Sequence, residues 1–348
     1  MRAAPRTGVV RLGGLSLRFR PRALLVAAAC LLLAAALAIV LIGSGDFTIS
    51  PANVVRSLIG QGQPAEDFII HRLRLPRVVT ALVVGAALGL AGALFQSLTR
   101  NPLGSPDILG FTQGSAAGAL AVIVLFGGGA VAMAAGSVVG ALAAGLAIYA
   151  LAGRGGAHGQ RLVLFGIGVA AILTGLNGYL LTQAKVFEAA GAMLWLVGSL
   201  DARDYADAVP PLVALAVLAP LVMIVCGRAV RMLEMGDEAA RALGVPIGAV
   251  RGLLLVAAVL LTALAGAAAG PVSFVALTAP QLARRLTRTT GPNLLPSLAM
   301  GAVLLTAADW VGLHAFPGRQ LPVGVVTGLL GGGYLIWLLV NERKAGRV

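Results

Sequence analysis

The chain has 348 residues, of which 59% are apolar and only 11% are charged, and its mean hydropathy is strongly positive. Apolar runs of about 20 residues recur along it, and runs of that length are typical of transmembrane helices. This composition excludes a soluble globular protein. The net charge of +13 does not indicate nucleic-acid binding, because the basic residues are spread over loops and chain ends, as the positive-inside rule expects.

Cysteine and histidine placement predicts neither a disulfide framework nor a metal site. Cys30 and Cys226 both fall in apolar runs, and the three histidines (His71, His158 and His314) are far apart without ligand spacing. There is no Walker lysine motif, no pair of carboxylates within one span and no Ser/His/Asp grouping. We therefore expect no catalytic residue, metal ligand or bound cofactor in this chain.

Ten transmembrane helices are expected in a single domain, residues 23–340, with both termini in the cytoplasm. Residues 1–22 form a basic N-terminal tail that contains arginine but no acid, and residues 341–348 form the C-terminal tail. All of these boundaries are approximate, and the eighth span is short and follows Gly270-Pro271. The predicted spans are 23–42, 78–98, 108–126, 131–151, 162–183, 208–226, 252–269, a segment ending near 282, 295–311 and 323–340.

The distribution of charge supports this topology. We assign both tails and the loops 99–107, 153–161, 228–251 and 284–293 to the cytoplasm. Of the 26 Lys and Arg residues, about 19 then lie inside and about 7 outside. Residues 43–71 form an external loop, and residues 188–198 form a short interfacial helix outside the membrane.

The cytoplasmic loop 228–251 is the most polar long segment of the chain. We expect a short amphipathic helix from Gly236 to Leu243, because Asp237 and Glu238 fall in its first turn, where the helix dipole favours acids. Gly244 is placed to end this helix. A short helix at the membrane surface anchors the chain weakly but offers a surface to other proteins. The segment therefore indicates a site where a cytoplasmic partner acts. The alternative is a solvated connector.

Polar residues inside the spans are few. The fifth span is the most polar, and its Thr174 and Asn177 are the best candidates for lining an aqueous path; the alternative is that each bonds a neighbouring backbone carbonyl. Asp309 is the one acid expected near membrane depth. It could act as a proton relay, but its place near a helix end beside Trp310 favours an interfacial position.

Three arginines cluster on the outside, just before the second span: Arg72, Arg74 and Arg77. Arginines at a membrane edge normally extend toward headgroups, but three within six residues could also meet acids on an external partner. Arg319 is a single candidate for the same role on another external loop.

Several stretches resemble the permease subunits of binding-protein-dependent ABC importers for ferric siderophores, haem and cobalamin, the FecCD type. They follow the family's order and spacing, and the resemblance covers the chain from Ala23 onward. It implies an all-α permease fold like that of the vitamin B12 importer, a type II ABC importer. The stretches are RLPR (74–77), GAALGLAGALFQSLTRNPLGSPDILGF (85–111), LEMGDEAARALGV (233–245), AGPVSFVAL (269–277) and LPVGVVTGLLGGGYLIWLL (321–339).

Within this family, the details are most similar to subunits for ferric enterobactin, a catecholate siderophore. Gln320 stands where many members have an acid, and enterobactin-type subunits have glutamine there. Gln281 departs from the family, which commonly has histidine after the proline of this motif. The cargoes expected from the resemblance are therefore a ferric siderophore first, and cobalamin or haem as alternatives. The alternatives from other functional classes are an ion-coupled secondary carrier and a membrane scaffold without transport.

The resemblance also implies partners and residue roles. The chain would pair with a second, related permease subunit, two copies of a cytoplasmic ATPase that binds ATP and Mg²⁺, and an external siderophore-binding protein, in the inner membrane. Arg74 and Arg77 match positions that dock the binding protein, and Asn101 matches a cytoplasmic gate position. The fifth span borders the path. The segment that resembles the ATPase-coupling helix includes Glu234, Gly236, Asp237, Ala240, Leu243 and Gly244.

Overall fold

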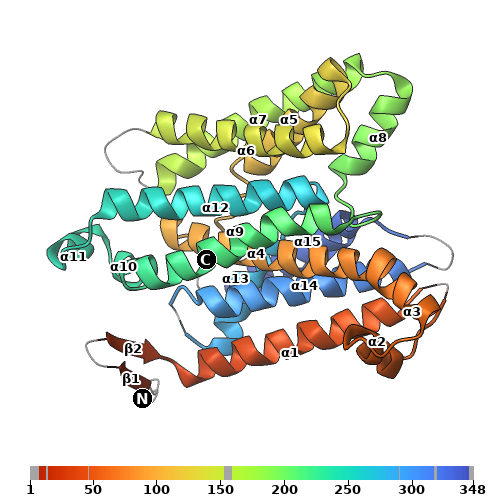
Figure 1. Cartoon of the computed structure of the whole chain (residues 1–348). Coiled ribbons are helices and arrows are strands. Elements are labelled where there is room, and N and C mark those ends of the chain that lie inside the picture. The colour runs from red at the N-terminus through yellow and green to blue at the C-terminus, as the bar shows by residue number, and fades with distance from the viewer. Residues whose placement is uncertain are drawn as a thin grey trace.

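The computed structural model describes residues 8–12, 15–45, 47–152, 159–289, 291–316 and 320–344. These residues form helices, short connections and one N-terminal hairpin (Figure 1). The helices are α1 (Pro21–Gly43), α2 (Pro51–Leu58), α3 (Pro64–Phe68), the π-helical η1 (Ile69–Arg74), α4 (Leu75–Thr99), α5 (Phe111–Phe126), α6 (Ala130–Ala152), α7 (Gly159–Gln183), α8 (Val186–Leu196), α9 (Tyr205–Leu221), the π-helical η2 (Val222–Cys226), α10 (Gly227–Leu233), α11 (Asp237–Ala242), α12 (Ile247–Ala269), α13 (Val275–Thr287), α14 (Leu294–His314) and α15 (Val323–Lys344).

The ten predicted spans correspond to ten of these helices. In the described part of the chain, seven helices are long and apolar enough to cross a membrane: α1, α4, α6, α7, α9, α12 and α14, of which α4 and α9 are lengthened by the helical segments next to them. The other three predicted spans are shorter and correspond to α5, α13 and α15. The helix α8 is the short external helix expected near residues 188–198.

Two helical segments are longer than the sequence predicts. The chain is continuously helical from Pro64 to Thr99, so the external arginines of the HRLRLPR stretch lie on a helix rather than in a loop. It is also helical from Tyr205 to Leu233, so the first part of loop 228–251 continues the sixth span. The π-helical turn η1 directly precedes α4, which has a proline in its first turn, and η2 directly follows α9, which has a proline near its end.

The basic N-terminal tail contains a hairpin that sequence analysis did not predict. Strand β1 (Gly8–Leu12) pairs antiparallel with β2 (Leu15–Phe19), with Val9 opposite Arg18. The hairpin lies at the same end of the helical bundle as α10 and α11, whereas α2, α3 and α8 lie at the opposite end (Figure 1). This arrangement agrees with placing the tail and the loop around α11 on one side of the membrane.

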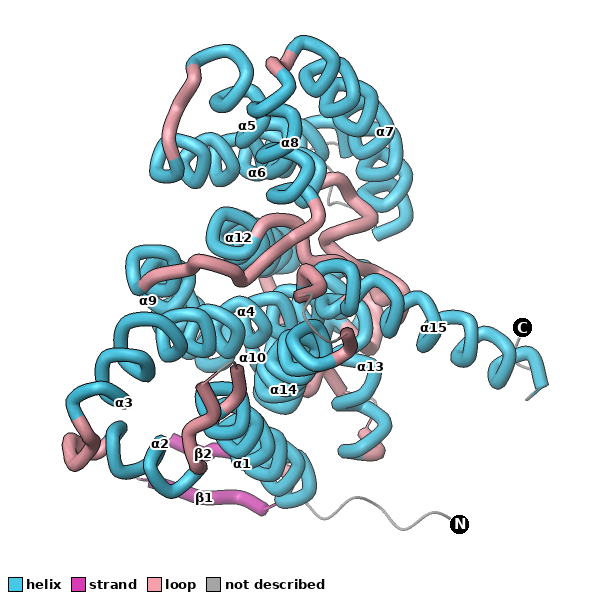
Figure 2. Tube along the Cα trace, turned by 90° about the vertical axis from the view of Figure 1, so that its right-hand side faces the viewer, coloured by secondary structure: helices cyan, strands magenta, loops and turns pink. Residues whose placement is uncertain are grey.

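The helix α4 is the centre of the bundle, with α14, α12, α13 and α9 packed around it (Figure 2). Its residues from Val83 to Leu98 are all buried. A second group, α5, α6 and α7, packs together and meets the first mainly through α12. Both groups are held together by close backbone approaches at small residues, as expected for helices that associate in lipid.

Glycines make these close approaches possible. A Cβ at Gly85 would collide with the carbonyl oxygen of Gly301 on α14, and one at Gly92 would collide with that of Ala276 on α13. The same relation joins Gly118 on α5 to Gly136 on α6. The high glycine content of the sequence therefore serves helix packing at these positions.

We expect Gly92→Ala to destabilise the fold by about 1–3 kcal/mol, the usual cost of forcing an extra methyl group into a packed interior. Thermal unfolding of the detergent-solubilised protein measures the effect. Gly168→Ala on α7 is the matched control, because no atom lies within 4 Å of a Cβ built there. Equal melting temperatures for the two variants would contradict the close contact of α4 with α13.

Candidate functional site

The short helix expected between Gly236 and Leu243 is present as α11. Gly236 precedes it with φ +110°, and Gly244 follows it with φ +79°, a left-handed conformation that favours glycine. The Gly244 N–H donates to Arg241 O at 2.9 Å and the Val245 N–H donates to Ala240 O at 3.0 Å. These two bonds form a Schellman motif, so the sequence fixes both the start and the end of this helix.

The helix α11 presents one face to the bundle and one to solvent. Ala240 is fully buried, whereas Leu243 and the preceding Met235 are 55% and 63% exposed. Exposed apolar side chains beside charged ones are what a protein contact surface requires. The helix α11 lies at the end of the bundle that also carries α10 and the β1–β2 hairpin (Figure 1).

Asp237 joins α11 to two other helices through arginines. Its Oδ1 lies 2.8 Å from Arg251 Nη2 on α12 and 3.1 Å from Arg100 Nη2, which follows α4. Arg251 is 6% exposed, so its charge is buried and needs this carboxylate. Asp237 thus serves as a structural contact in addition to its favourable place in the first turn of α11.

Glu234 lies outside α11, at the C-terminal end of α10. It is half-buried, and burial raises the pKa of its carboxyl above the usual range, while the positive charges of Arg284, Arg20 and Arg231 act in the opposite direction. The segment expected to couple to the ATPase therefore has two parts. Glu234 caps α10 and lies near Arg20 of the tail and Arg284 of α13, and the second part is the short helix α11.

The loop that follows α4, residues 100–110, begins next to α11 and continues into the bundle. Asn101 is exposed near the start of this loop, and its Oδ1 accepts a hydrogen bond from the Leu103 N–H at 2.9 Å. Gln281 on α13 donates from Nε2 to the carbonyl oxygen of Pro102. The glutamine that departs from the family pattern therefore holds the loop that contains the expected gate residue.

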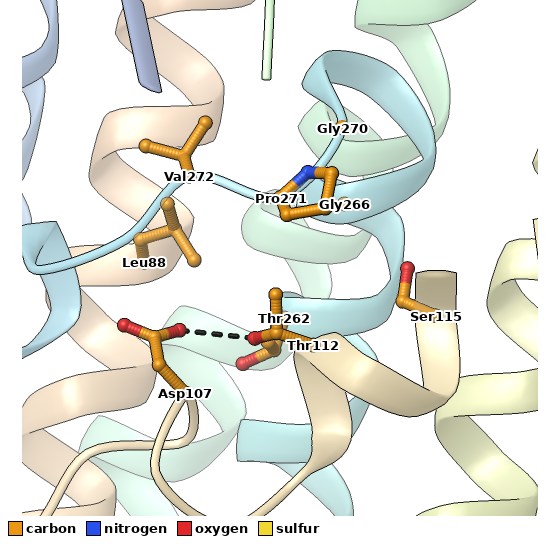
Figure 3. Close-up of a pocket in the computed structure, with 9 residues that line it drawn as sticks. All are labelled: Leu88, Asp107, Thr112, Ser115, Thr262, Gly266, Gly270, Pro271 and Val272. Atoms are coloured by element: carbon orange, nitrogen blue, oxygen red, sulfur yellow. Dashed lines mark hydrogen bonds between the residues drawn. The ribbon is translucent and has the colours of Figure 1, made fainter. Parts of the chain in front are cut away.

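The far end of this loop holds an acid whose place the sequence analysis missed. Asp107 was expected in a cytoplasmic loop, but it lines a small pocket beside Leu88 in the middle of α4 and Thr262 in α12 (Figure 3). Its Oδ1 accepts from Thr112 Oγ1 at 3.0 Å, and its Oδ2 accepts from the Phe274 N–H at 3.2 Å. The chain turns back between the helices at Asp107, so the end of this loop packs inside the bundle, while the cytoplasmic side assigned to loop 99–107 stays a prediction.

The second acid within the bundle, Asp309, is paired with an arginine. Asp309 is 1% exposed, and Arg77 on α4 donates to its two oxygens at 2.9 and 3.1 Å. Asp309 faces the protein, whereas the neighbouring Trp310 is exposed, and the pair lies near the ends of α4 and α14, so an interfacial position stays the prediction for this residue. A carboxylate with both oxygens occupied by one guanidinium is poorly placed to relay protons.

The external arginines also contact their own chain. Arg74 donates to the carbonyl oxygens of Ile42 and Phe47 at 2.7 and 2.6 Å, which ties α4 to the end of α1. Arg77 reaches Gln320 Oε1 at 3.4 Å and lies 3.5 Å from Asp201, in addition to its contact with Asp309. Arg72 is exposed. Arg319 lies outside the described residues.

The two polar residues of α7 do not face a common space. Asn177 is buried and donates from Nδ2 to Gln113 O and Oε1 on α5, both at 3.3 Å. Thr174 is exposed and donates to the carbonyl oxygen of Ala170 in its own helix at 2.8 Å. Most of the other residues of α7 are exposed, so this helix leaves a long surface uncovered within the single chain.

The comparison with protein families gives a match over almost the whole membrane domain. Residues 30–341 match the FecCD transport family. The chain belongs to this family. The family match begins after the N-terminal hairpin, so the hairpin lies outside the shared part.

Individual relatives agree. The FecCD chain is 44% identical to the ferric enterobactin transport system permease protein FepG of Escherichia coli (strain K12), over 86% of this chain and 91% of that protein. It is 35% identical to the achromobactin transport system permease protein CbrC of Dickeya dadantii (strain 3937), over 90% of each chain. Among solved structures, an inward-facing metal-chelate type ABC transporter matches with a TM-score of 0.79 and 24% identity, over 92% of this chain and 99% of that one.

This family membership defines the class of protein. The chain is a permease subunit of an iron-chelate type ABC transporter in the inner membrane, and it is not itself an enzyme, since ATP is hydrolysed by a separate subunit. Family members work with ATPase subunits and binding proteins. The 24% identity of the solved relative supports the fold alone.

We expect Gly244→Val to uncouple ATP hydrolysis from transport, because a β-branched residue is strained at φ +79° and would open the Schellman motif that ends α11. The measurement is substrate moved per ATP hydrolysed by the reconstituted transporter. Gly248→Val is the control, since Gly248 has an ordinary φ and open space around its Cβ. Wild-type coupling in Gly244→Val would show that the glycine cap is dispensable.

We expect Asp309→Ala to lower the free energy of unfolding by about 3–5 kcal/mol, because it leaves the Arg77 charge without its buried partner. Thermal unfolding in detergent measures the loss. Asp201→Ala is the control: Asp201 also lies near Arg77, but its side chain is 72% exposed, so we expect a change of no more than about 0.5 kcal/mol. Equal losses of unfolding free energy in Asp309→Ala and Asp201→Ala would show that the buried pair contributes no more than the exposed one.

Proposed function

We propose that this permease carries a ferric siderophore of the catecholate type, similar to enterobactin, across the cytoplasmic membrane. The observation that carries the proposal is the 44% identity to the ferric enterobactin permease over 86% of the chain. Other relatives are named for transport of achromobactin or of iron as citrate or hydroxamate complexes, and they are 32–37% identical. The common element is a bulky ferric chelate, and the higher identity favours the catecholate.

The proposed mechanism is alternating access driven by ATP on the partner subunits. Two copies of the ATPase, with Mg²⁺, would contact the exposed side of α11 around Leu243. Closure of the ATPase pair would displace α11, and the bundle would reorient around it. Both ends of α11 support this role, because Gly236 and Gly244 define its length and Asp237 attaches it to the bundle.

A second permease subunit, related but different, would complete the transporter. The exposed surface of α7 is the candidate for its contact and for the path of the substrate, with Thr174 on that surface. Asn177 is buried against α5, which favours a supporting role for this residue. The path needs to tolerate the chelate rather than to select it, because the external binding protein would make the selection.

An external siderophore-binding protein would dock on the face that contains α2, α3 and α8. Arg74 and Arg77 are the residues proposed for its acids, with the undescribed Arg319 as a third. Since Arg74 and Arg77 already bond groups of their own chain, docking acids would have to share or replace those contacts. Arg72 in the same stretch is exposed and makes no ion pair among the described residues.

The uptake of radioactive iron tests the proposal. Cells that lack this gene are supplied separately with ferric catecholate and ferric hydroxamate siderophores, and labelled cobalamin is compared beside them. We expect selective loss of catecholate uptake, restored by the wild-type gene and equally lost when the ATPase partner is deleted. Selective loss of another substrate would overturn the catecholate proposal. Uptake that persists without any ATPase and depends on Asp309 would instead favour an ion-coupled carrier.

A further inference from the structure

The ion pair between Arg100 and Asp237 joins the two cytoplasmic segments that the transport cycle must move together. Arg100 Nη2 lies 3.1 Å from Asp237 Oδ1. Arg100 follows the last residue of α4 and is the first residue of the loop 100–110, which contains Asn101. Asp237 is the first residue of α11, the helix proposed to receive the push of the ATPase. No other ion pair among the described residues joins this loop to α11.

The two arginines that share Asp237 differ in burial, and the difference separates their roles. The Arg251 side chain is 7% exposed, so removing its partner would leave a buried charge and damage the fold. The Arg100 side chain is 40% exposed, and an ion pair at that exposure contributes little to stability, because water can replace it. Stability therefore explains the Arg251 contact but not the one with Arg100.

The backbone of Arg100 ends α4 in the left-handed conformation. Its φ is +51°, a left-handed conformation that is uncommon for residues with a side chain. Glycine would occupy this position without strain, as it does at Gly110 at the other end of the loop. Arg288 ends α13 in the same conformation, with φ +52°, so the left-handed backbone of Arg100 is that of a helix end and does not depend on the contact with Asp237.

The other hydrogen bonds of the loop connect it to α13. Pro102 O accepts from Gln281 near the middle of α13, and Asp107 accepts from the N–H of Phe274 immediately before α13. The loop is therefore attached to α13 at two points and to α11 at its first residue. A displacement of α11 that pulls on Arg100 is passed through hydrogen bonds to the whole loop and to α13.

We propose that Arg100 is a positioning residue that couples displacement of α11 to the gate loop 100–110. The proposal rests on the proposed function, since it assumes that ATPase partners move α11. Arg251 keeps Asp237 aligned with α12, and Arg100 carries the motion into the loop. Loss of Arg100 leaves α11 docked but disconnects it from the gate.

The variant Arg100→Gln tests this directly, because it removes the guanidinium and leaves the Asp237–Arg251 pair in place. In the complete transporter reconstituted in vesicles, we expect ATP hydrolysis within twofold of wild type and transport per ATP reduced by about tenfold, within the range for residues that carry coupling. Arg288→Gln is the matched control, because Arg288 is exposed, ends α13 with a similar φ of +52° and makes no ion pair among the described residues; its ratio stays at the wild-type value. Wild-type transport per ATP in Arg100→Gln overturns the proposal.

A double-mutant comparison separates coupling from a general loss of structure. If the two side chains act as one unit, Arg100→Gln lowers transport per ATP in the wild-type background and has no further effect when added to Asp237→Asn. If the two losses multiply, the pair does not act as a unit and the proposal fails. We expect Asp237→Asn to have a lower melting temperature than Arg100→Gln, because it removes the partner of the buried Arg251.

A second readout does not depend on the cargo. A spin label on Leu103→Cys, a partly exposed position in the loop, changes its mobility when the ATPase is trapped with ATP and vanadate. We expect this change in the wild-type background and its loss with Arg100→Gln; a full response without Arg100 overturns the proposal. If the wild-type transporter moves no ferric siderophore, the proposed function fails, and the label still decides the role of Arg100.

Discussion

The close packing of α4 at the centre of the bundle is the constraint on which the rest of the structure depends. Lipid offers no hydrogen bonds, so each helix satisfies its own backbone and associates through contact. Glycines on α4 and its neighbours bring the backbones together where any side chain would collide. A helix held in this way on all sides moves only together with its neighbours.

Each end of α4 carries an arginine that binds an acid from elsewhere in the chain. Arg77 at the external end binds Asp309 of α14, and Arg100 at the cytoplasmic end binds Asp237 of α11. The first pair is largely buried, so removal of either partner would leave an uncompensated charge inside the protein. The second is partly exposed, involves α11, the helix proposed to contact the ATPase, and can be formed or broken at low cost. The two pairs thus suit a rigid external end and a responsive cytoplasmic end.

The proposed alternating access requires segments that have two arrangements separated by a small free-energy difference. The loop 100–110 fits this requirement better than the helices around it. It contacts the bundle through a small number of hydrogen bonds from Gln281, Phe274 and Thr112, whereas α4 itself is packed along its whole length. The pocket beside Asp107 lies where this loop meets α5 and α12, so movement of the loop would change its shape.

The sequence by itself determined the membrane helices, the family and the short helix α11. Hydrophobic length defines a span, and glycine at Gly236 and Gly244 defines the ends of α11, so both can be predicted from neighbouring residues alone. The side-chain partners could not be predicted in this way. Asp309 and Arg77 are 232 positions apart, and Asp107 enters the bundle only because its loop turns back toward α13. Only the tertiary structure decided which charges meet, because pairing between distant segments depends on how helices pack and leaves no local pattern.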